Sequence, residues 1–209
     1  MNLEQNVTAR RGRPKSEEKR QQIAEAAAHL FLTEGFERTS MDSIASHAGV
    51  SKQTVYSHFA NKDELFRSCI SGKVAEYDLT VAPSEFHTLE SGLRAFSDGY
   101  LRLLSDPRVV SMWRLVMAEA IEHPHVTQVF YETGPQQTLD SLTRFLEHHA
   151  DELDVEDFGK AARTLFGMTA DQFQSRIMLG IDSGVPDDVR SAHVDYVTEL
   201  FLKLFAKPN

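Results

Sequence analysis

Apolar residues near the start of the chain recur at the three- to four-residue spacing of an amphipathic helix. The spacing predicts a helix over residues 16–35, with an apolar stripe formed by Ile23, Ala27, Leu30 and Phe31. Gly35 follows this stripe and can adopt the left-handed conformation that ends many helices. We expect this helix to cover the apolar faces of the elements that follow it.

Residues 39–59 contain two shorter helical patterns joined by a tight turn. The apolar face of the first consists of Ile44, Ala45 and Ala48, and that of the second consists of Val55 and Phe59. Ser40 and Ser51 precede the two patterns and can cap the helices with their hydroxyl groups. Gly49 lies between them, where a left-handed residue allows the chain to turn. This arrangement predicts a helix-turn-helix.

The outward side of the second short helix is polar, and it carries Lys52, Gln53, Thr54, Tyr56 and Ser57. A short helix that exposes a row of hydrogen-bonding groups suits the major groove of DNA. Gln53 is the best candidate for a base contact, because its amide can both donate to and accept from adenine. Lys52 and Thr54 are expected to contact DNA beside it.

The rest of the chain is predicted to be helical, with breaks at proline and glycine. The expected helices cover about residues 62–78, 86–104, 107–122, 126–150, 154–181 and 187–205, and a looser segment with Pro83 lies at 80–85. Gly134-Pro135 falls inside the 126–150 helix and should kink or break it. Strand-like alternation is missing from the sequence, so the predicted fold class is all-α.

Two stretches resemble a known family. Thr39-Ser-Met-Asp-Ser-Ile-Ala, Ala48-Gly-Val-Ser-Lys-Gln-Thr-Val-Tyr-Ser-His-Phe59 and Asn61-Lys-Asp-Glu-Leu-Phe66 are similar to the DNA-binding domain of TetR-family transcriptional regulators, over residues 11–66. Residues 109–120, with Val129-Phe-Tyr-Glu-Thr-Gly-Pro135, resemble the C-terminal domain of the AefR-like branch. The resemblance implies a homodimer that holds two DNA-binding heads apart and binds a palindromic double-stranded operator, most commonly as a repressor.

The chain is therefore expected to have three parts: a flexible basic arm at 1–15, a helix-turn-helix DNA-binding domain at 16–62, and a helical effector-binding and dimerisation domain at 63–209. The last two helices are apolar on more than one side, and packing them against their copies would form a four-helix bundle. We expect the homodimer to form there.

The net charge of −9 is unevenly distributed. Residues 1–67 hold ten Lys/Arg and nine Asp/Glu, a balance of +1, and the remainder has a balance of −10. A basic end on an acidic body would direct that end toward phosphate. The arm, with Arg10, Arg11, Arg13 and Lys15, is expected to reach the minor groove or the phosphates, or else to act only as a solubilising tail. Phosphate contacts are also expected from Ser40, Ser51, Tyr56, His58 and Lys62.

Methionine and aromatic residues in the C-terminal part could line a pocket for a small apolar effector. The candidates are Met112, Trp113, Met117, Phe130, Phe166 and Phe173. Side chains of these types at helical spacing also form ordinary core, so both interpretations remain open. An effector would act by moving the helix over 62–78, provided that it binds the DNA-free state more tightly.

Other function classes lack support in the sequence. We find no glycine-rich phosphate loop, nucleophile elbow or metal-ligand spacing, so we expect no enzyme activity, no cofactor and no bound metal. A single cysteine, Cys69, fits a reducing compartment, and the absence of a signal core or a membrane-spanning run predicts a cytoplasmic protein with no membrane partner. The main alternative is an architectural or interaction protein that binds DNA without any effector.

Overall fold

The computed structural model describes residues 15–79 and 88–208. For residues 15, 171 and 172 it describes the backbone alone. Its elements in chain order are α1 (Lys15–Glu34), α2 (Met41–His47), α3 (Lys52–His58), α4 (Lys62–Ala75), α5 (Leu89–Ser105), α6 (Pro107–Glu119), α7 (Pro124–Tyr131), η2 (Glu132–Gln136), α8 (Gln137–His148), α9 (Phe158–Met178) and α10 (Asp187–Phe205). Within these residues the only β pairing is an isolated bridge between Leu153 and Ala206. The predicted all-α fold is confirmed.

Contacts divide the chain into two compact units between Leu65 and Phe66, inside α4. In the first unit Gly35, where φ is +88°, directly follows α1, and the turn after α2 contains Gly49, where φ is +64°. These are the two glycines for which a left-handed residue was predicted. The apolar residues predicted to face inward on these three helices and directly after them are all buried, with exposed fractions of 0–6%.

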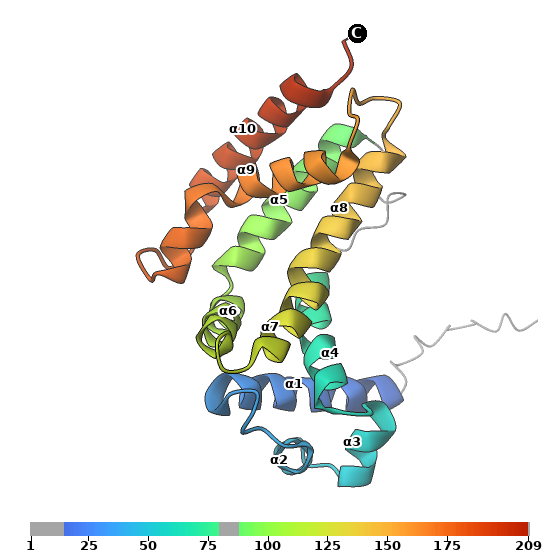
Figure 1. Cartoon of the computed structure of the whole chain (residues 1–209), viewed down its shortest axis with the longest axis vertical. Coiled ribbons are helices and arrows are strands. Elements are labelled where there is room, and N and C mark those ends of the chain that lie inside the picture. The colour runs from blue at the N-terminus through green and yellow to red at the C-terminus, as the bar shows by residue number, and fades with distance from the viewer. Residues whose placement is uncertain (1–14, 80–87, 209) are drawn as a thin grey trace, which may run out of the picture. The chain divides into compact units, whose positions relative to one another are not determined.

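In the second unit, α5 packs against α8, α9 and α10 (Figure 1). Its main core contains Leu93 and Phe96 of α5, Phe145 of α8, Leu165 of α9 and Phe201 of α10. A smaller cluster joins the end of α5 to α6, α9 and α10, and its buried members are Leu101, Val110, Ile177, Val185 and Val194. The central helix of this unit is therefore α5, which contributes to both clusters.

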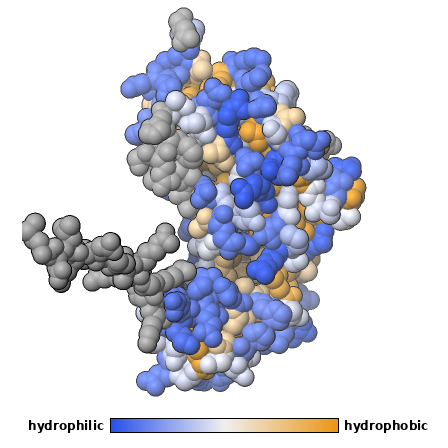
Figure 2. Space-filling model, turned by 180° about the vertical axis from the view of Figure 1, so that it is seen from behind, coloured by the Kyte–Doolittle hydropathy of each residue, from blue (hydrophilic) through white to orange (hydrophobic). Residues whose placement is uncertain are grey.

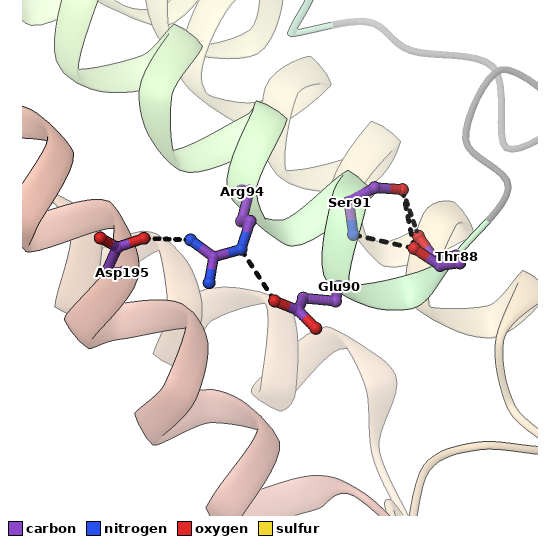
Figure 3. Close-up of polar contacts among 5 residues, drawn as sticks. All are labelled: Thr88, Glu90, Ser91, Arg94 and Asp195. Atoms are coloured by element: carbon purple, nitrogen blue, oxygen red, sulfur yellow. Dashed lines mark hydrogen bonds and ion pairs between the residues drawn. The ribbon is translucent and has the colours of Figure 1, made fainter.

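Polar contacts fix the start of α5 and join it to α10 (Figure 3). Thr88 caps α5, because its hydroxyl accepts a hydrogen bond from the Ser91 N–H at 3.1 Å. Arg94, one turn further along, forms ion pairs with Glu90 on its own helix and with Asp195 on α10. The guanidinium group thus links two helices whose apolar faces already pack together.

The predicted break at Gly134-Pro135 is present, as a π-helical turn (η2) with Pro135 inside it, between α7 and α8. The structure corrects the neighbouring boundaries. Pro124 and His125, expected in a turn, form the first turn of α7, because proline suits the first position of a helix. The fourth helix ends at Ala75 rather than near Asp78, whose φ of +55° is incompatible with a helix.

The start of α9 also differs from the expectation. The helix predicted from residue 154 begins at Phe158, because Asp157 accepts a hydrogen bond from the Lys160 N–H and caps it. The expected loose segment at 80–85 lies outside the described residues. Among the residues that are described, none of the helices is both long and apolar enough to span a bilayer.

Candidate DNA-binding surface

The short helices α2 and α3 begin with the serine caps that the sequence predicts. The Ser40 hydroxyl accepts a hydrogen bond from the Ser43 N–H at 3.0 Å, and the Ser43 hydroxyl accepts one in return from the Ser40 N–H at 3.0 Å. At α3, the Ser51 hydroxyl accepts a hydrogen bond from the Thr54 N–H at 3.1 Å and lies 2.8 Å from the Thr54 hydroxyl. These caps stabilise two seven-residue helices that bury few side chains.

The two sides of α3 differ sharply in exposure. Val55 is fully buried and Phe59, directly after the helix, is 1% exposed. Most candidate DNA contacts lie on the other side: Lys52, Gln53 and Tyr56 are exposed, and Thr54 and His58 are half-buried. The helix therefore presents its polar residues outward from a fixed apolar base, as the sequence analysis expected.

Two side chains of α1 hold the ends of α2 and α3, and the sequence analysis did not identify either of them. Arg20 donates a hydrogen bond from Nη1 to the His58 carbonyl at 2.8 Å, and its guanidinium lies 4.2 Å from the centre of the Phe59 ring. Gln22 donates from Nε2 to the Ala48 carbonyl, at the end of α2, at 2.7 Å. Both contacts satisfy carbonyls at helix ends, which lack partners within the helix.

Lys62 occupies a different environment from the phosphate-binding position expected for it. Its ammonium donates hydrogen bonds to the carbonyls of Phe36 at 2.7 Å and Glu37 at 3.3 Å, and it lies 4.3 Å from the centre of the Phe36 ring. These contacts tie the start of α4 to the loop after α1. The start of α4 is capped by Asn61, whose Oδ1 accepts a hydrogen bond from the Glu64 N–H at 2.8 Å.

Lys52 and Asp42 form an exposed ion pair between α3 and α2. Lys52 Nζ lies 2.7 Å from Oδ1 and 2.9 Å from Oδ2 of Asp42. The hydrogen bond and the charge of Asp42 raise the pKa of Lys52 above its usual value. The ammonium also lies 5.9 Å from the centre of the Tyr56 ring. Two of the candidate DNA-contacting side chains are thus brought together, with a carboxylate beside them.

The remaining candidates of the arm are only partly described. Lys15 is the first residue of α1. Arg10, Arg11 and Arg13 lie outside the described residues.

The six candidate effector-binding residues occupy separate environments in the second unit. Trp113 of α6 and Phe130 of α7 are in contact edge to face, with ring centres 4.9 Å apart. Met112, on the same helix as Trp113, is half-buried. Met117 is 59% exposed. These four residues belong to the α6–α7 side of the unit.

The other two candidates lie on α9, in different contacts. Phe166 packs against Tyr100 of α5, with ring centres 4.4 Å apart, and Phe173 packs against His193 of α10, with ring centres 4.9 Å apart. Burial raises the pKa of Tyr100 well above its usual value. The described part of the chain contains a small apolar crevice, partly open to solvent, which is lined by Leu79, Gly92, Phe96, Ser141, Leu142 and Phe145. None of the six candidates lines this crevice.

Comparisons with known proteins agree with the division into two parts. Residues 23–69 match the family model of bacterial regulatory proteins of the tetR family. Residues 91–207 match the model of the AefR-like transcriptional repressor C-terminal domain. The HTH-type transcriptional regulator TtgR of Pseudomonas putida is 37% identical over 76 residues, which are 36% of this chain and 36% of TtgR. The chain thus spans about a third of the length of this curated relative.

Solved structures match over most of the chain. The flavonoid-responsive regulator FrrA is 30% identical, with a TM-score of 0.71, and the match covers 92% of this chain and 100% of that one. A TetR-family transcriptional regulator of Pseudomonas syringae is 27% identical, with a TM-score of 0.64, and the match covers 92% and 99% of the two chains.

Proposed function

We propose a function that starts from the family: the chain belongs to the TetR family of bacterial transcriptional regulators, which bind DNA, and has an AefR-like C-terminal domain. In this proposal the protein is a ligand-responsive repressor. It binds a palindromic operator as a homodimer and is released from the DNA by a small apolar effector. Regulators of this family are not enzymes.

The observation that carries the DNA-binding proposal is the geometry of α3. The helix is capped by Ser51, fixed on its apolar side by Val55 and Phe59, and exposes Gln53 on its polar side. Its residues Lys52, Gln53 and Thr54 would enter the major groove, with Gln53 hydrogen-bonded to a base. The hydroxyls of Ser40, Ser51 and Tyr56 and the side chain of His58 would contact phosphates and set the position of the helix.

Exposed apolar residues support a homodimer through α9 and α10. Tyr196 and Leu204 of α10 are 62% and 57% exposed, and Leu179, directly after α9, is 76% exposed. Large exposed apolar side chains commonly mark interfaces. On the face shown in Figure 2, hydrophobic residues reach the surface in several separate patches among hydrophilic ones. A two-fold interface between copies of α9 and α10 would cover the exposed apolar side chains that lie on these helices.

Polar contacts join η2 and the start of α6 to the part of α4 that belongs to the second unit. Near its middle, Arg67 of α4 donates a hydrogen bond to the Thr133 hydroxyl at 3.0 Å and pairs with Glu132 at 3.3 Å, both on the π-helical turn η2. At its end, Lys73 pairs with Asp106, the N-cap of α6, at 2.9 Å. An effector that shifts η2 or the start of α6 would therefore displace α4.

Asp106 is the centre of the second contact. Burial opposes its ionisation, but hydrogen bonds from Lys73, from the Tyr77 hydroxyl at 2.8 Å and from the Arg108 N–H at 2.7 Å outweigh that effect, and the pKa of Asp106 is lowered. The carboxylate is thus ionised at neutral pH and holds the end of α4 against the start of α6.

The class of effector follows from the residues around α6, α7 and α9. Trp113, Phe130 and Phe166 supply flat aromatic surfaces, and Met112 supplies a flexible apolar one. FrrA, which matches over almost the whole chain, is flavonoid-responsive. We therefore propose that the effector is a small planar apolar molecule. Its binding requires the separate packing contacts of these side chains to open into one pocket.

The DNA-binding role is tested with Gln53→Ala. Purified protein should shift DNA from the promoter region of its own gene and should protect a two-fold symmetric site. Loss of a bidentate base contact costs about 1–3 kcal/mol, or roughly 5- to 150-fold in specific affinity. Binding to random-sequence DNA and its salt dependence should hardly change, because Gln53 neutralises no phosphate.

A matched control is Gln21→Ala, which removes an exposed amide from α1, away from α3 in sequence. It should leave both affinities unchanged. Equal losses of specific and random-sequence binding in Gln53→Ala would refute the base contact. The effector is tested separately with a panel of planar apolar compounds: if none changes the thermal stability or the operator affinity, the effector-independent DNA-binding protein becomes the better description.

A further inference from the structure

Asp42 is an acidic residue whose partner is a candidate DNA-contacting side chain. Both of its carboxylate oxygens lie within hydrogen-bonding distance of Lys52 Nζ, at 2.7 and 2.9 Å. Lys52 is the first residue of α3, and Asp42 lies in the first turn of α2. The two side chains are 59% and 63% exposed, so an approaching DNA molecule can reach the pair.

Packing does not account for this pair. The buried residues of α2 are Met41, Ile44 and Ala45, and Asp42 is not among them. Asp42 is well placed electrostatically, because the N-terminus of a helix favours a negative charge, whereas Lys52 carries a positive charge at the N-terminus of α3. The carboxylate offsets that unfavourable charge and holds the ammonium on the α2 side of α3.

The pair has different consequences for phosphates and for bases. An ammonium has three N–H donors; Asp42 accepts a hydrogen bond from one of them through Oδ2, and its Oδ1 lies at ion-pair distance. A phosphate that approaches Lys52 meets an ammonium whose charge Asp42 already offsets, and the carboxylate beside it repels the phosphate. A base-edge acceptor, such as O6 or N7 of guanine, carries no full charge and needs only one of the other N–H groups.

We propose that Asp42 is a specificity-determining residue that restrains Lys52 and weakens its sequence-independent binding to phosphate. The proposal rests on the proposed DNA-binding function. On random DNA, no base acceptor is in register with the held ammonium, so the restraint lowers affinity. On the operator, the ion pair persists and Lys52 donates another N–H to a base, so the restraint costs little.

The test measures binding of a fluorescent random-sequence duplex, and of the promoter fragment, at several KCl concentrations. The proteins are wild type, Asp42→Asn, Lys52→Gln and the double variant. In Asp42→Asn the freed Lys52 gains a phosphate contact, so the slope of log affinity against log salt on random DNA should steepen by about 0.9. Random-sequence affinity should rise several-fold, affinity for the promoter fragment should change less, and their ratio should fall.

The double variant separates a specific release of Lys52 from a general change in charge. Lys52→Gln should flatten the slope by about 0.9 in the Asp42→Asn background, and by much less in the wild-type background. Glu34→Gln, which removes an exposed carboxylate from the end of α1, is the matched charge control and should leave the slope unchanged. Asp42→Ala should behave as Asp42→Asn does, and circular dichroism checks that each variant is folded.

Two results overturn the proposal while leaving the proposed function intact. One is an unchanged salt slope in Asp42→Asn. The other is an equal loss of slope on removing Lys52 in both backgrounds, which would mean that Lys52 already contacts phosphate fully in the wild type. If wild-type protein shows no preference for promoter DNA over random DNA, the proposed function fails and this proposal falls with it.

Discussion

Replacing Lys62 with methionine distinguishes a structural lysine from a phosphate contact. The sequence places Lys62 at the start of a helix, where a phosphate contact is expected. In the structure its ammonium instead donates to the carbonyls of Phe36 and Glu37. Methionine keeps most of the apolar stem and removes the ammonium, so the variant leaves the packing of the stem largely intact and deletes the polar contacts.

The size of the effect follows from those contacts. A hydrogen bond that involves a charged group contributes about 1.5–3 kcal/mol. The ammonium also lies 4.3 Å from the centre of the Phe36 ring, and a cation–π contact contributes a further ~0.5–1 kcal/mol. Water can replace part of the lost bonding, because Lys62 is only half-buried. We expect Lys62→Met to lose about 1.5–3 kcal/mol of stability.

The assay combines urea unfolding, followed by far-UV circular dichroism, with the salt dependence of binding to random-sequence DNA. Lys52→Met is the matched control, since it removes the same charge from an exposed ion pair and should change stability much less. Lys62→Met should lower the urea midpoint clearly and leave the salt slope of the folded protein unchanged. A structural role for Lys62 is refuted if Lys62→Met lowers the urea midpoint no more than Lys52→Met does and flattens the salt slope by about 0.9, the value for one lost phosphate contact.

Two further variants test the second unit. A Cβ at Gly92 would lie 2.1 Å from Cζ of Phe145, so Gly92→Ala should lower the stability of the protein by about 1–3 kcal/mol. Gly72 has open space around it, so Gly72→Ala should stabilise α4 by up to ~1 kcal/mol. Urea midpoints of the two variants that move in the same direction would contradict this. Asp106→Asn keeps the cap of α6 but loses the ion pair with Lys73. Because the folded pKa of Asp106 is lowered, the ionised carboxylate stabilises the fold above pH ~4, and this stabilisation is lost as the pH falls through the folded pKa. The variant should therefore be less stable than wild type at pH 7, and the difference should shrink as the pH is lowered below ~4; a difference that does not change with pH would rule out this origin.

Local signals were enough to predict the local structure of the candidate DNA-binding surface. Ser40 and Ser51 cap the helices that follow them, because a cap depends on residues only two or three positions away. The inward position of Val55 follows from helical spacing alone, and it fixes which residues of α3 point outward. Gly134-Pro135 likewise predicts a break, since proline cannot donate the hydrogen bond that a regular helix needs.

Contacts between residues far apart in sequence could not be predicted in the same way. Arg20 and the His58 carbonyl are 38 positions apart, and no periodic pattern indicates that they meet. Periodicity shows which side of a helix is buried but not which neighbour covers it. Trp113 and Phe173 were therefore grouped as pocket candidates, although one contacts Phe130 of α7 and the other contacts His193 of α10.

The contacts of the Lys and Arg side chains bear on how an acidic protein could bind DNA selectively. Within residues 16–65 every Lys and Arg side chain has a partner in its own chain: Lys19, Arg20, Arg38, Lys52 and Lys62. Three of them, Arg20, Arg38 and Lys62, donate to backbone carbonyls at helix ends or in loops, and Lys52 is paired with a carboxylate. The folded part of this domain thus offers little positive charge that a phosphate can bind without competition. Under the proposed function, sequence-independent attraction would then come mainly from the basic residues at 10–15, and contacts of α3 with bases would contribute a larger share of the affinity for the correct site.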